Sequence, residues 1–454
     1  MKCDEIEACA LKAAGQPHKI YFDFDNWTMR YDLICDNAGY RSHSKTGLLV
    51  TSTLTCLILL VYADILGRLK LVRISSFIVI AGICLTAFIP SFVVKMVGLG
   101  LVGGAEGAFS ALFTIYINEN TVKTTKMRSS LVSISFLAYS IGCVLFNCFA
   151  YVTTNPYILC GICGIMIICS VVPSCLFFHE TPYFLYKKGK ITELFTVLMD
   201  IYMYNQGKKG CDETLYIAVE NQIIKLLGFD THITTKAWFK SHTLQLHRKR
   251  LKDAPSGNAL KRLCNSGKHL YALVTLIFVG GLIYMLFYGM SINIQELGLK
   301  NIKMNGILLG VTQAIGNLSV VPFMHKMPRR LWTIIFQIAI FLGAALLFML
   351  SRETQTSMVQ FEQTVTSTLW MATIMSAIFP LFFMYTSETF PTEVRGTANA
   401  IILFSAKLIG STSPLLENFS KNHKIHVLAG CSALVILSLP LSFGMKETLT
   451  RMTN

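Results

Sequence analysis

The apolar residues of this chain gather in long, nearly uninterrupted runs that are separated by short polar segments. Each run holds about 20 residues, which as a helix is enough to cross the roughly 30 Å hydrocarbon core of a bilayer. A backbone in lipid must satisfy its own hydrogen bonds, and the runs are too long for barrel strands. The pattern therefore predicts an all-α integral membrane protein with about 11 transmembrane helices. The expected spans lie near Thr46–Leu66, Val72–Val94, Met96–Ile117, Ser129–Tyr151, Pro156–Phe178, Tyr271–Ile292, Asn305–Met324, Leu331–Leu350, Ser367–Thr386, Ala398–Leu416 and His426–Phe443.

The spacing of the spans divides the chain into five parts. Residues 1–45 hold no run long enough to cross a bilayer and no secretory signal. The positive-inside rule makes them an extracytoplasmic N-terminal segment. Residues 46–178 hold about five spans and residues 270–445 hold six. The connection between them, residues 179–269, is far longer than an ordinary loop, and residues 446–454 form a C-terminal tail.

Basic residues cluster in alternate connections between the spans. Arg68, Lys70 and Arg73 follow the first span, and Arg329 and Arg330 lie in a later connection on the same side of the alternation. By the positive-inside rule these loops face the cytoplasm or a matrix. The N-terminus is then outside and the C-terminus inside, which agrees with an odd number of spans.

Composition supports a membrane protein over a nucleic-acid-binding one. The chain is 53% hydrophobic and 14% charged, with a mean hydropathy of +0.53, whereas soluble proteins average roughly 25% charged residues. The formal charge is +15, but its Lys and Arg residues lie between the apolar runs. We interpret them, including the basic run His247–Lys252, as topology signals and contacts to anionic lipids.

Nothing in the sequence indicates an enzyme, a metal site or a cofactor. Most of the 14 cysteines lie inside apolar runs, where small hydrophobic packing residues are expected. Cys160 and Cys163 form a C-x-x-C pair, but no second pair or nearby histidine accompanies it. No Gly-rich phosphate loop, zinc-protease motif or nucleophile elbow is present.

One stretch resembles a known family. The run E-T-F-P-T-E-V-R-G-T at Glu388–Thr397 resembles the junction between the tenth and eleventh helices of Major Facilitator Superfamily transporters, closest to the organic cation, anion and carnitine transporters. The resemblance covers the chain from about Asp23 to Glu447. Further motifs in matching order are T-M-R-Y-D-L-I-C-D at Thr28–Asp36, Y-A-D-I-L-G-R-L-K at Tyr62–Lys70, E-T-P-Y-F-L at Glu180–Leu185 and F-Y-G-M-S-I-N at Phe287–Asn293.

The resemblance implies a bundle of two halves joined by a cytoplasmic or matrix linker, with a substrate site near the midplane. In the family a transmembrane helix precedes the motif found here at Tyr31–Asp36, so this first helix is expected to be missing. The surface it would cover is then expected to meet other membrane subunits or lipid.

Lys407 is the leading candidate for substrate binding, because it falls near the middle of a span, where a charge is costly. A basic residue occupies this position in anion- and carnitine-handling relatives, so the resemblance implies a carboxylate-bearing or other anionic substrate. The alternative is a lysine that reaches the interface or pairs with an acid. Glu106 is a second charge within a span. It is expected either to pair with a basic residue for structural reasons, which we favour, or to bind substrate. Tyr288, Asn293 and Gln313 are the further expected lining residues, with interhelical hydrogen bonding as the alternative for Asn293 and Gln313.

The resemblance also implies a gate. Its expected residues are Asp64, Gly67 and Arg68 after the first span, with Glu388 and Arg395 at the turn before the penultimate one.

The signature loops around this gate depart from the family pattern. Leu60 and Ile65 replace a glycine and a basic residue, and Tyr183 replaces an arginine. In the second half, His325 and Pro328 stand where an acid and a glycine are expected. These departures predict one dominant conformation and impaired transport.

Two functions remain open at this point. The first is a transporter for a small organic ion, either a carboxylate or a carnitine-like compound. The second is a structural subunit of a large membrane complex that reuses the transporter fold without transport. The expected location is the plasma membrane or an organelle membrane, with the mitochondrial inner membrane belonging to the second function.

Overall fold

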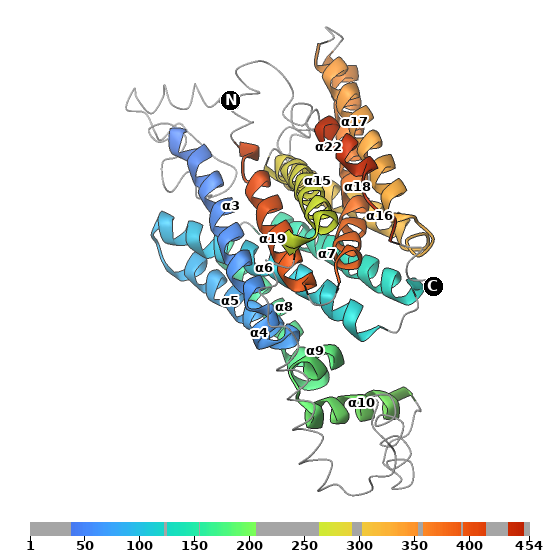
Figure 1. The fold of residues 1–454 in the computed structure, drawn as a ribbon. Helices are drawn as coiled ribbons and strands as arrows, with labels where there is room; N and C mark the ends of the chain where they lie inside the picture. Colours follow the sequence, from blue (N-terminus) through green and yellow to red (C-terminus); the bar gives the residue numbers. More distant parts are fainter. Residues whose placement is uncertain are drawn as a thin grey trace, which may run out of the picture.

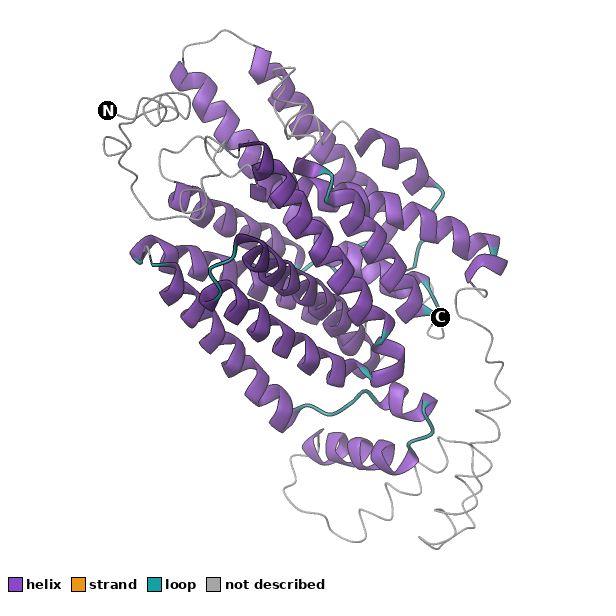
Figure 2. Cartoon of the chain, turned by 90° about the vertical axis from the view of Figure 1, so that its left-hand side faces the viewer, coloured by secondary structure: helices purple, strands orange, loops and turns teal. Residues whose placement is uncertain are grey.

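The computed structural model of the protein describes residues 38–121, 125–153, 155–205, 263–292, 302–352, 357–391, 394–414 and 435–448. Every regular element in these ranges is a helix (Figure 2). Seven helices among the described residues are long and apolar enough to cross a membrane, and Lys45–Val61 forms a shorter apolar one. The prediction of an all-helical integral membrane protein is confirmed.

The first half is built from α3 (Ala38–Val61), the short α4 (Ala63–Leu66), α5 (Arg68–Phe88), α6 (Phe92–Asn120), α7 (Thr125–Val152) and α8 (Pro156–Phe177). One predicted boundary is wrong: the expected span Val72–Val94 runs past the end of α5. The cause is Pro90, which has no backbone N–H and disfavours helical geometry at the residue before it. Ile89 accordingly has extended dihedrals, φ −94° and ψ 122°.

The second half is built from α15 (Gly267–Ile292), α16 (Ile302–Val320), α17 (Arg329–Arg352), α18 (Ser357–Thr389), α19 (Arg395–Gly410) and α22 (Val435–Phe443). Each expected span of this half overlaps one of these helices, and α15 to α19 all begin before the expected start. The start of the last one, before Val435, lies outside the described residues, as does Asn293.

Part of the predicted linker forms two helices beyond the bundle. They are α9 (Pro182–Lys187) and α10 (Ile191–Asn205), and Figure 1 shows them projecting from one end of the molecule. Residues 1–37 and 206–262, which include the Tyr31–Asp36 motif and the basic run His247–Lys252, lie outside the described residues. The five-part division and the missing first helix stay predictions.

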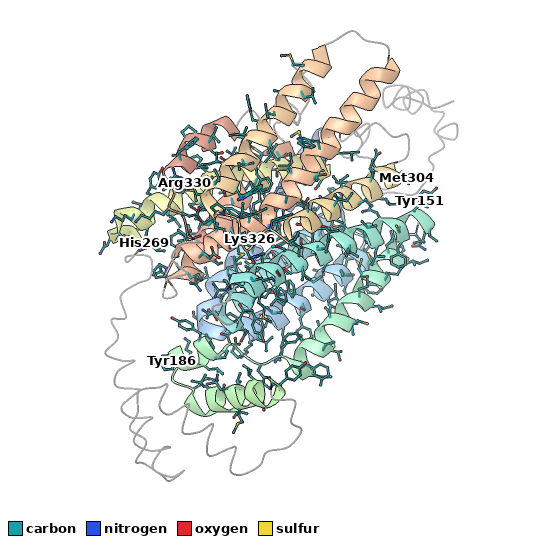
Figure 3. The ribbon with its side chains drawn as sticks, turned by 90° about the vertical axis from the view of Figure 1, so that its right-hand side faces the viewer. Tyr151, Tyr186, His269, Met304, Lys326 and Arg330 are labelled. Carbon is teal, nitrogen blue, oxygen red and sulfur yellow. The ribbon has the colours of Figure 1, made fainter. Side chains whose placement is uncertain are left out.

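The ends of the bundle differ in charge. Tyr151, near the end of α7, lies beside Met304, near the start of α16, whereas His269 and Arg330 lie at the opposite end (Figure 3). We call the end that carries the starts of α5, α15 and α17 the basic end. It is the end that the positive-inside rule assigns to the cytoplasm or matrix.

The two halves meet along two helix pairs. Helix α3 packs against α19, and α7 packs against α16. Helices α6 and α18 face each other between these pairs and come together toward the basic end, where Asn118 Nδ2 donates a hydrogen bond of 2.6 Å to Ser387 Oγ. This arrangement leaves a central space between the halves.

Candidate functional site

A cavity of about 590 Å³ fills the space between the two halves. Its walls come from helices α3, α6, α7, α15, α16, α18 and α19, so both halves contribute. Aromatic and serine side chains make up most of the lining, and two charged side chains, Glu106 and Lys407, face it. Four of the five residues expected at a substrate site therefore line one cavity, namely Lys407, Tyr288, Gln313 and Glu106.

Lys407 crosses from the second half to the first. Its side chain is only 3% exposed, and its Nζ donates a hydrogen bond of 3.2 Å to the backbone carbonyl of Gly103 on α6. The ammonium lies directly over Gly107, one turn further along the same helix. A lysine ammonium has three N–H donors, and two of them have no partner among the described residues. These donors are free to bind an anion.

Glu106 faces the cavity from the same helix. Its side chain is exposed to this space, and no hydrogen bond or ion pair joins it to Lys407 or to any other residue in the described ranges. The cavity thus presents a cation and an anion that are close enough to influence each other electrostatically but are not paired. Such a wall can bind both charges of a dipolar ligand.

Aromatic rings line the same cavity as these two charges. Tyr284 and Phe287 of α15 both pack edge-on against Phe379 of α18, with ring centroids 5.4 and 5.1 Å apart. The ring centroids of Tyr288 and Tyr284 lie 5.8 Å apart. Aromatic rings offer a large apolar surface, and their faces attract cations. The cavity therefore suits an organic ion better than a bare inorganic one.

The polar residues of α16 have different roles. Gln313 is 8% exposed and lines the cavity. Asn317 also lines it, but its Nδ2 donates 2.7 Å to Ser140 Oγ on α7 and so links the two halves. This bond matches the interhelical role that polar residues have within membrane bundles.

The cavity is closed toward the basic end. Phe136 of α7 and Phe383 of α18 line the cavity and pack against each other, with centroids 5.2 Å apart. The bond between Asn118 and Ser387 lies about one turn beyond the lining residues Phe113 and Phe383. These contacts join α6 and α7 to α18 and form a floor between the site and the basic end.

A buried ion pair lies below this floor in the first half. Arg68 pairs with Glu119 at 3.2 Å, and both side chains are at most 5% exposed. Glu119 also accepts a bond of 2.6 Å from Thr181 Oγ1. Glu180 accepts from the backbone N–H of Arg68 at 3.0 Å and so caps the start of α5. Gly67 makes this possible, because its φ is +105° and a Cβ there would collide with Glu180.

The second half repeats the same set of contacts. Arg329 pairs with Glu388 at 3.2 Å, and both side chains are at most 2% exposed. Thr448 Oγ1 donates 2.8 Å to Glu388, and Glu447 accepts 2.8 Å from the backbone N–H of Arg329 at the start of α17. The repeat equates α5, α6 and α8 with α17, α18 and the end of α22. The two halves are therefore structural repeats of each other at this end of the bundle.

The expected gate residues fall within or beside these clusters. The clusters include Gly67, Arg68 and Glu388. Arg395 lies close enough to Glu119 and Glu388 to interact with them electrostatically. The side chain of Asp64 lies outside the described residues. Pro328, where the family pattern expects a glycine, directly precedes the capped residue Arg329. The cap forms there despite the substitution, since it uses the N–H groups of Arg329 and Arg330.

Sequence reasoning missed several members of the site and the clusters. Glu119 and Arg329 are buried partners, Glu447 is a half-buried one, and Gly107 supports Lys407. One weak signal was available: two of the five Glu-Thr dipeptides in the chain, at 180–181 and 447–448, each follow the last span of a half. No local signal marks Gly107.

A helical bundle of two repeated halves around a central, charged and aromatic cavity defines a membrane protein of the transporter type. The chain belongs to the Major Facilitator Superfamily, whose family profile matches residues 44–414. The resemblance drawn from the motifs is thereby confirmed at the level of the superfamily.

Individual relatives are distant. The chain is 24% identical over 419 residues to the human steroid transmembrane transporter SLC22A24, covering 92% of this chain and 70% of that protein. It is 22% identical over 446 residues to solute carrier family 22 member 16 of Xenopus laevis, covering 92% and 69%.

Solved structures share the fold. The proton:xylose symporter XylE, bound to 6-bromo-6-deoxy-D-glucose, superposes with a TM-score of 0.60 at 17% identity, over 90% of this chain and 87% of that one. The human organic anion transporter MFSD10 gives 0.57 at 13% identity, over 89% and 83%.

Proposed function

We propose that this protein binds and transports a small organic zwitterion of the carnitine type, which carries a carboxylate and a quaternary ammonium group. The observation behind the proposal is that Lys407 and Glu106 face one aromatic cavity without pairing with each other. A ligand with both charges would satisfy both side chains, whereas a simple anion or cation would satisfy one.

Lys407 is the proposed carboxylate site. Its ammonium is held by Gly103 through one N–H and keeps two others for a ligand. A carboxylate that leaves water for this cavity needs such a partner, because an unpaired charge in a dry site is very costly. Glu106 with the rings of Tyr284, Tyr288 and Phe379 is the proposed ammonium site, since carboxylates and aromatic faces both attract organic cations.

The named functions of the relatives agree with an organic substrate. One is a steroid transporter and another is an organic anion transporter. They support the class of compound. The zwitterion itself rests on the two charges of this cavity.

The test is binding and uptake by purified protein with three probes: carnitine, a carboxylate of similar size without the ammonium, and choline. Carnitine should bind most tightly. Lys407→Gln should weaken carnitine binding by roughly tenfold or more, since each 1.4 kcal/mol of lost interaction lowers the affinity tenfold. It should leave choline binding unchanged. Glu106→Gln should weaken the binding of carnitine and choline and leave the binding of the simple carboxylate unchanged.

Lys190→Gln is the matched control, because Lys190 is exposed and pairs with Glu193 outside the bundle. Equal carnitine binding by wild type and Lys407→Gln would refute the proposed site. We further propose that transport is slow, because the gate loops depart from the family pattern at Leu60, Ile65, His325 and Pro328. Carnitine binding without uptake in liposomes would instead support the alternative function, a bundle that serves a membrane complex and does not transport.

A further inference from the structure

A second, smaller cavity adjoins the central one within the first half. It measures about 130 Å³ and lies between α5, α6 and α8. We call it the side pocket. Two of its lining residues, Ser170 and Phe178, are exposed, so the side pocket lies near the lipid-facing surface. The charged groups Glu106 and Lys407 do not line it.

Two phenylalanines form the boundary between the cavities. Phe109 and Phe113 line both the central cavity and the side pocket. They lie one turn apart on α6 and stack in parallel, with ring centroids 5.7 Å apart and an angle of 9° between the planes. Phe109 is 39% exposed although it lies within a spanning helix. The two rings are thus a shared wall that a chain running from one cavity to the other has to pass.

The chemistry of the side pocket suits hydrocarbon. Its polar groups are mainly serine hydroxyls whose protons are already used within their own helices. Ser76 donates to Val72 O at 3.1 Å, Ser170 donates to Ile167 O at 2.7 Å, and Ser174 donates to Val171 O at 2.7 Å. Tyr116 likewise donates to His179 O at 2.8 Å. These hydroxyls offer an anion no free donor, and the remaining lining is apolar.

The geometry points to a substrate with an apolar tail. We infer that the ionic head of the substrate lies between Lys407 and Glu106, while an acyl chain passes Phe109 and Phe113 into the side pocket. Glu106 and Phe113 are seven residues apart on α6, so the tail has to span about 10 Å at 1.5 Å per residue. An acyl chain of medium length, attached to a zwitterionic head group, is long enough to cover this distance. The inference rests on the proposed function and adds a substrate class to it.

The experiment compares two probes, carnitine and octanoyl-carnitine, on purified protein in nanodiscs. Wild type should bind octanoyl-carnitine at least roughly tenfold more tightly, because burying a few methylene groups is worth that much. Ser76→Phe and Ser174→Phe each fill the side pocket from a different helix. Each should lower the ratio of the two affinities toward one.

Cys169→Phe is the control, since Cys169 is exposed on α8 and does not line the side pocket. It should leave the ratio at its wild-type value. Equal affinity of both probes for wild type, the result expected if a bilayer acyl chain fills the side pocket, would overturn the inference. So would an unchanged ratio in both filling variants.

Lys407→Gln separates this inference from the proposed function. If the head site is right, this variant weakens both probes together, whatever the filling variants do. If Lys407→Gln leaves carnitine binding unchanged, the head site itself fails and the tail placement fails with it.

Discussion

The ammonium of Lys407 lies where a side chain on Gly107 would have to be. A Cβ built on Gly107 collides with Lys407 Nζ and with Cε, which would be 2.6 Å away. Gly103, one turn earlier on α6, supplies the carbonyl that accepts from the same ammonium. A lysine from the second half thus rests on a bare turn of a helix in the first half, and its position depends on a residue that has no side chain.

Gly107→Ala should therefore reduce carnitine binding without preventing folding. The added methyl group displaces the lysine ammonium, and losing its hydrogen bond to the carboxylate would cost about 1.5–3 kcal/mol, or roughly tenfold or more in affinity. Gly142→Ala is the matched control, because a Cβ at Gly142 of α7 meets nothing within 4 Å. Isothermal titration of both variants measures the effect, and equal affinities would show that Lys407 does not need this space.

Gly67→Ala should lower stability. Its φ of +105° is strained for any residue with a Cβ, and the new methyl group would also displace Glu180 from the start of α5. The expected loss is about 1–3 kcal/mol. Gly47→Ala, at an α3 position with nothing within 4 Å, should show no loss in the same thermal unfolding measurement. A melting temperature for Gly67→Ala equal to that of Gly47→Ala would count against the capping role.

The buried pair of Arg329 and Glu388 should be strongly coupled. Removing one partner leaves a buried charge uncompensated, which typically costs about 3–5 kcal/mol. Arg329→Met should therefore destabilise the protein severely, and adding Glu388→Gln to it should restore part of the loss. A double-mutant cycle followed by thermal unfolding gives the coupling. Additive effects of the two substitutions would mean that the pair contributes no interaction energy.

Asn118→Ala should loosen the basic end. The variant removes the bond to Ser387 that joins α6 to α18 below the cavity. Hydrogen exchange in the segment 113–121 is expected to accelerate, because local opening no longer has to break this contact. Asn120→Ala is the control, since Asn120 Nδ2 donates to the carbonyl of Tyr116 within α6 itself. Identical exchange in the two variants would show that the floor is held by the aromatic packing instead.

The hydrophobic runs predicted the helices well because lipid imposes a length and a composition on every span. The same signal could not find helix ends, where a single residue such as Pro90 decides. Lys407 and Glu106 stood out as candidates because charges within spans are rare. Their unpaired state could not be predicted, since it depends on where two helices from different halves come to lie.

The ion pairs below the cavity were harder to predict. Arg68 and Glu119 are 51 residues apart in sequence, and each looks like an ordinary loop or helix-end charge. Their partnership follows from the packing of α5 against α6, which no local pattern encodes. The Glu-Thr dipeptides at 180–181 and 447–448 become informative only once both halves are seen to use them in the same way.

The hydrogen bond from Lys407 to Gly103 has a further consequence for motion. Because it joins α19 to α6, it connects the halves, as do the bonds of Asn118 and Asn317. The two Arg–Glu pairs, in contrast, lie within single halves and can stay intact while the halves tilt. A carboxylate bound to the other two N–H groups of Lys407 would leave this bond in place, and a hydrogen bond from a charged donor is worth about 1.5–3 kcal/mol. In the proposed function, the lysine that binds the substrate therefore also holds the two halves together until its bond to Gly103 breaks.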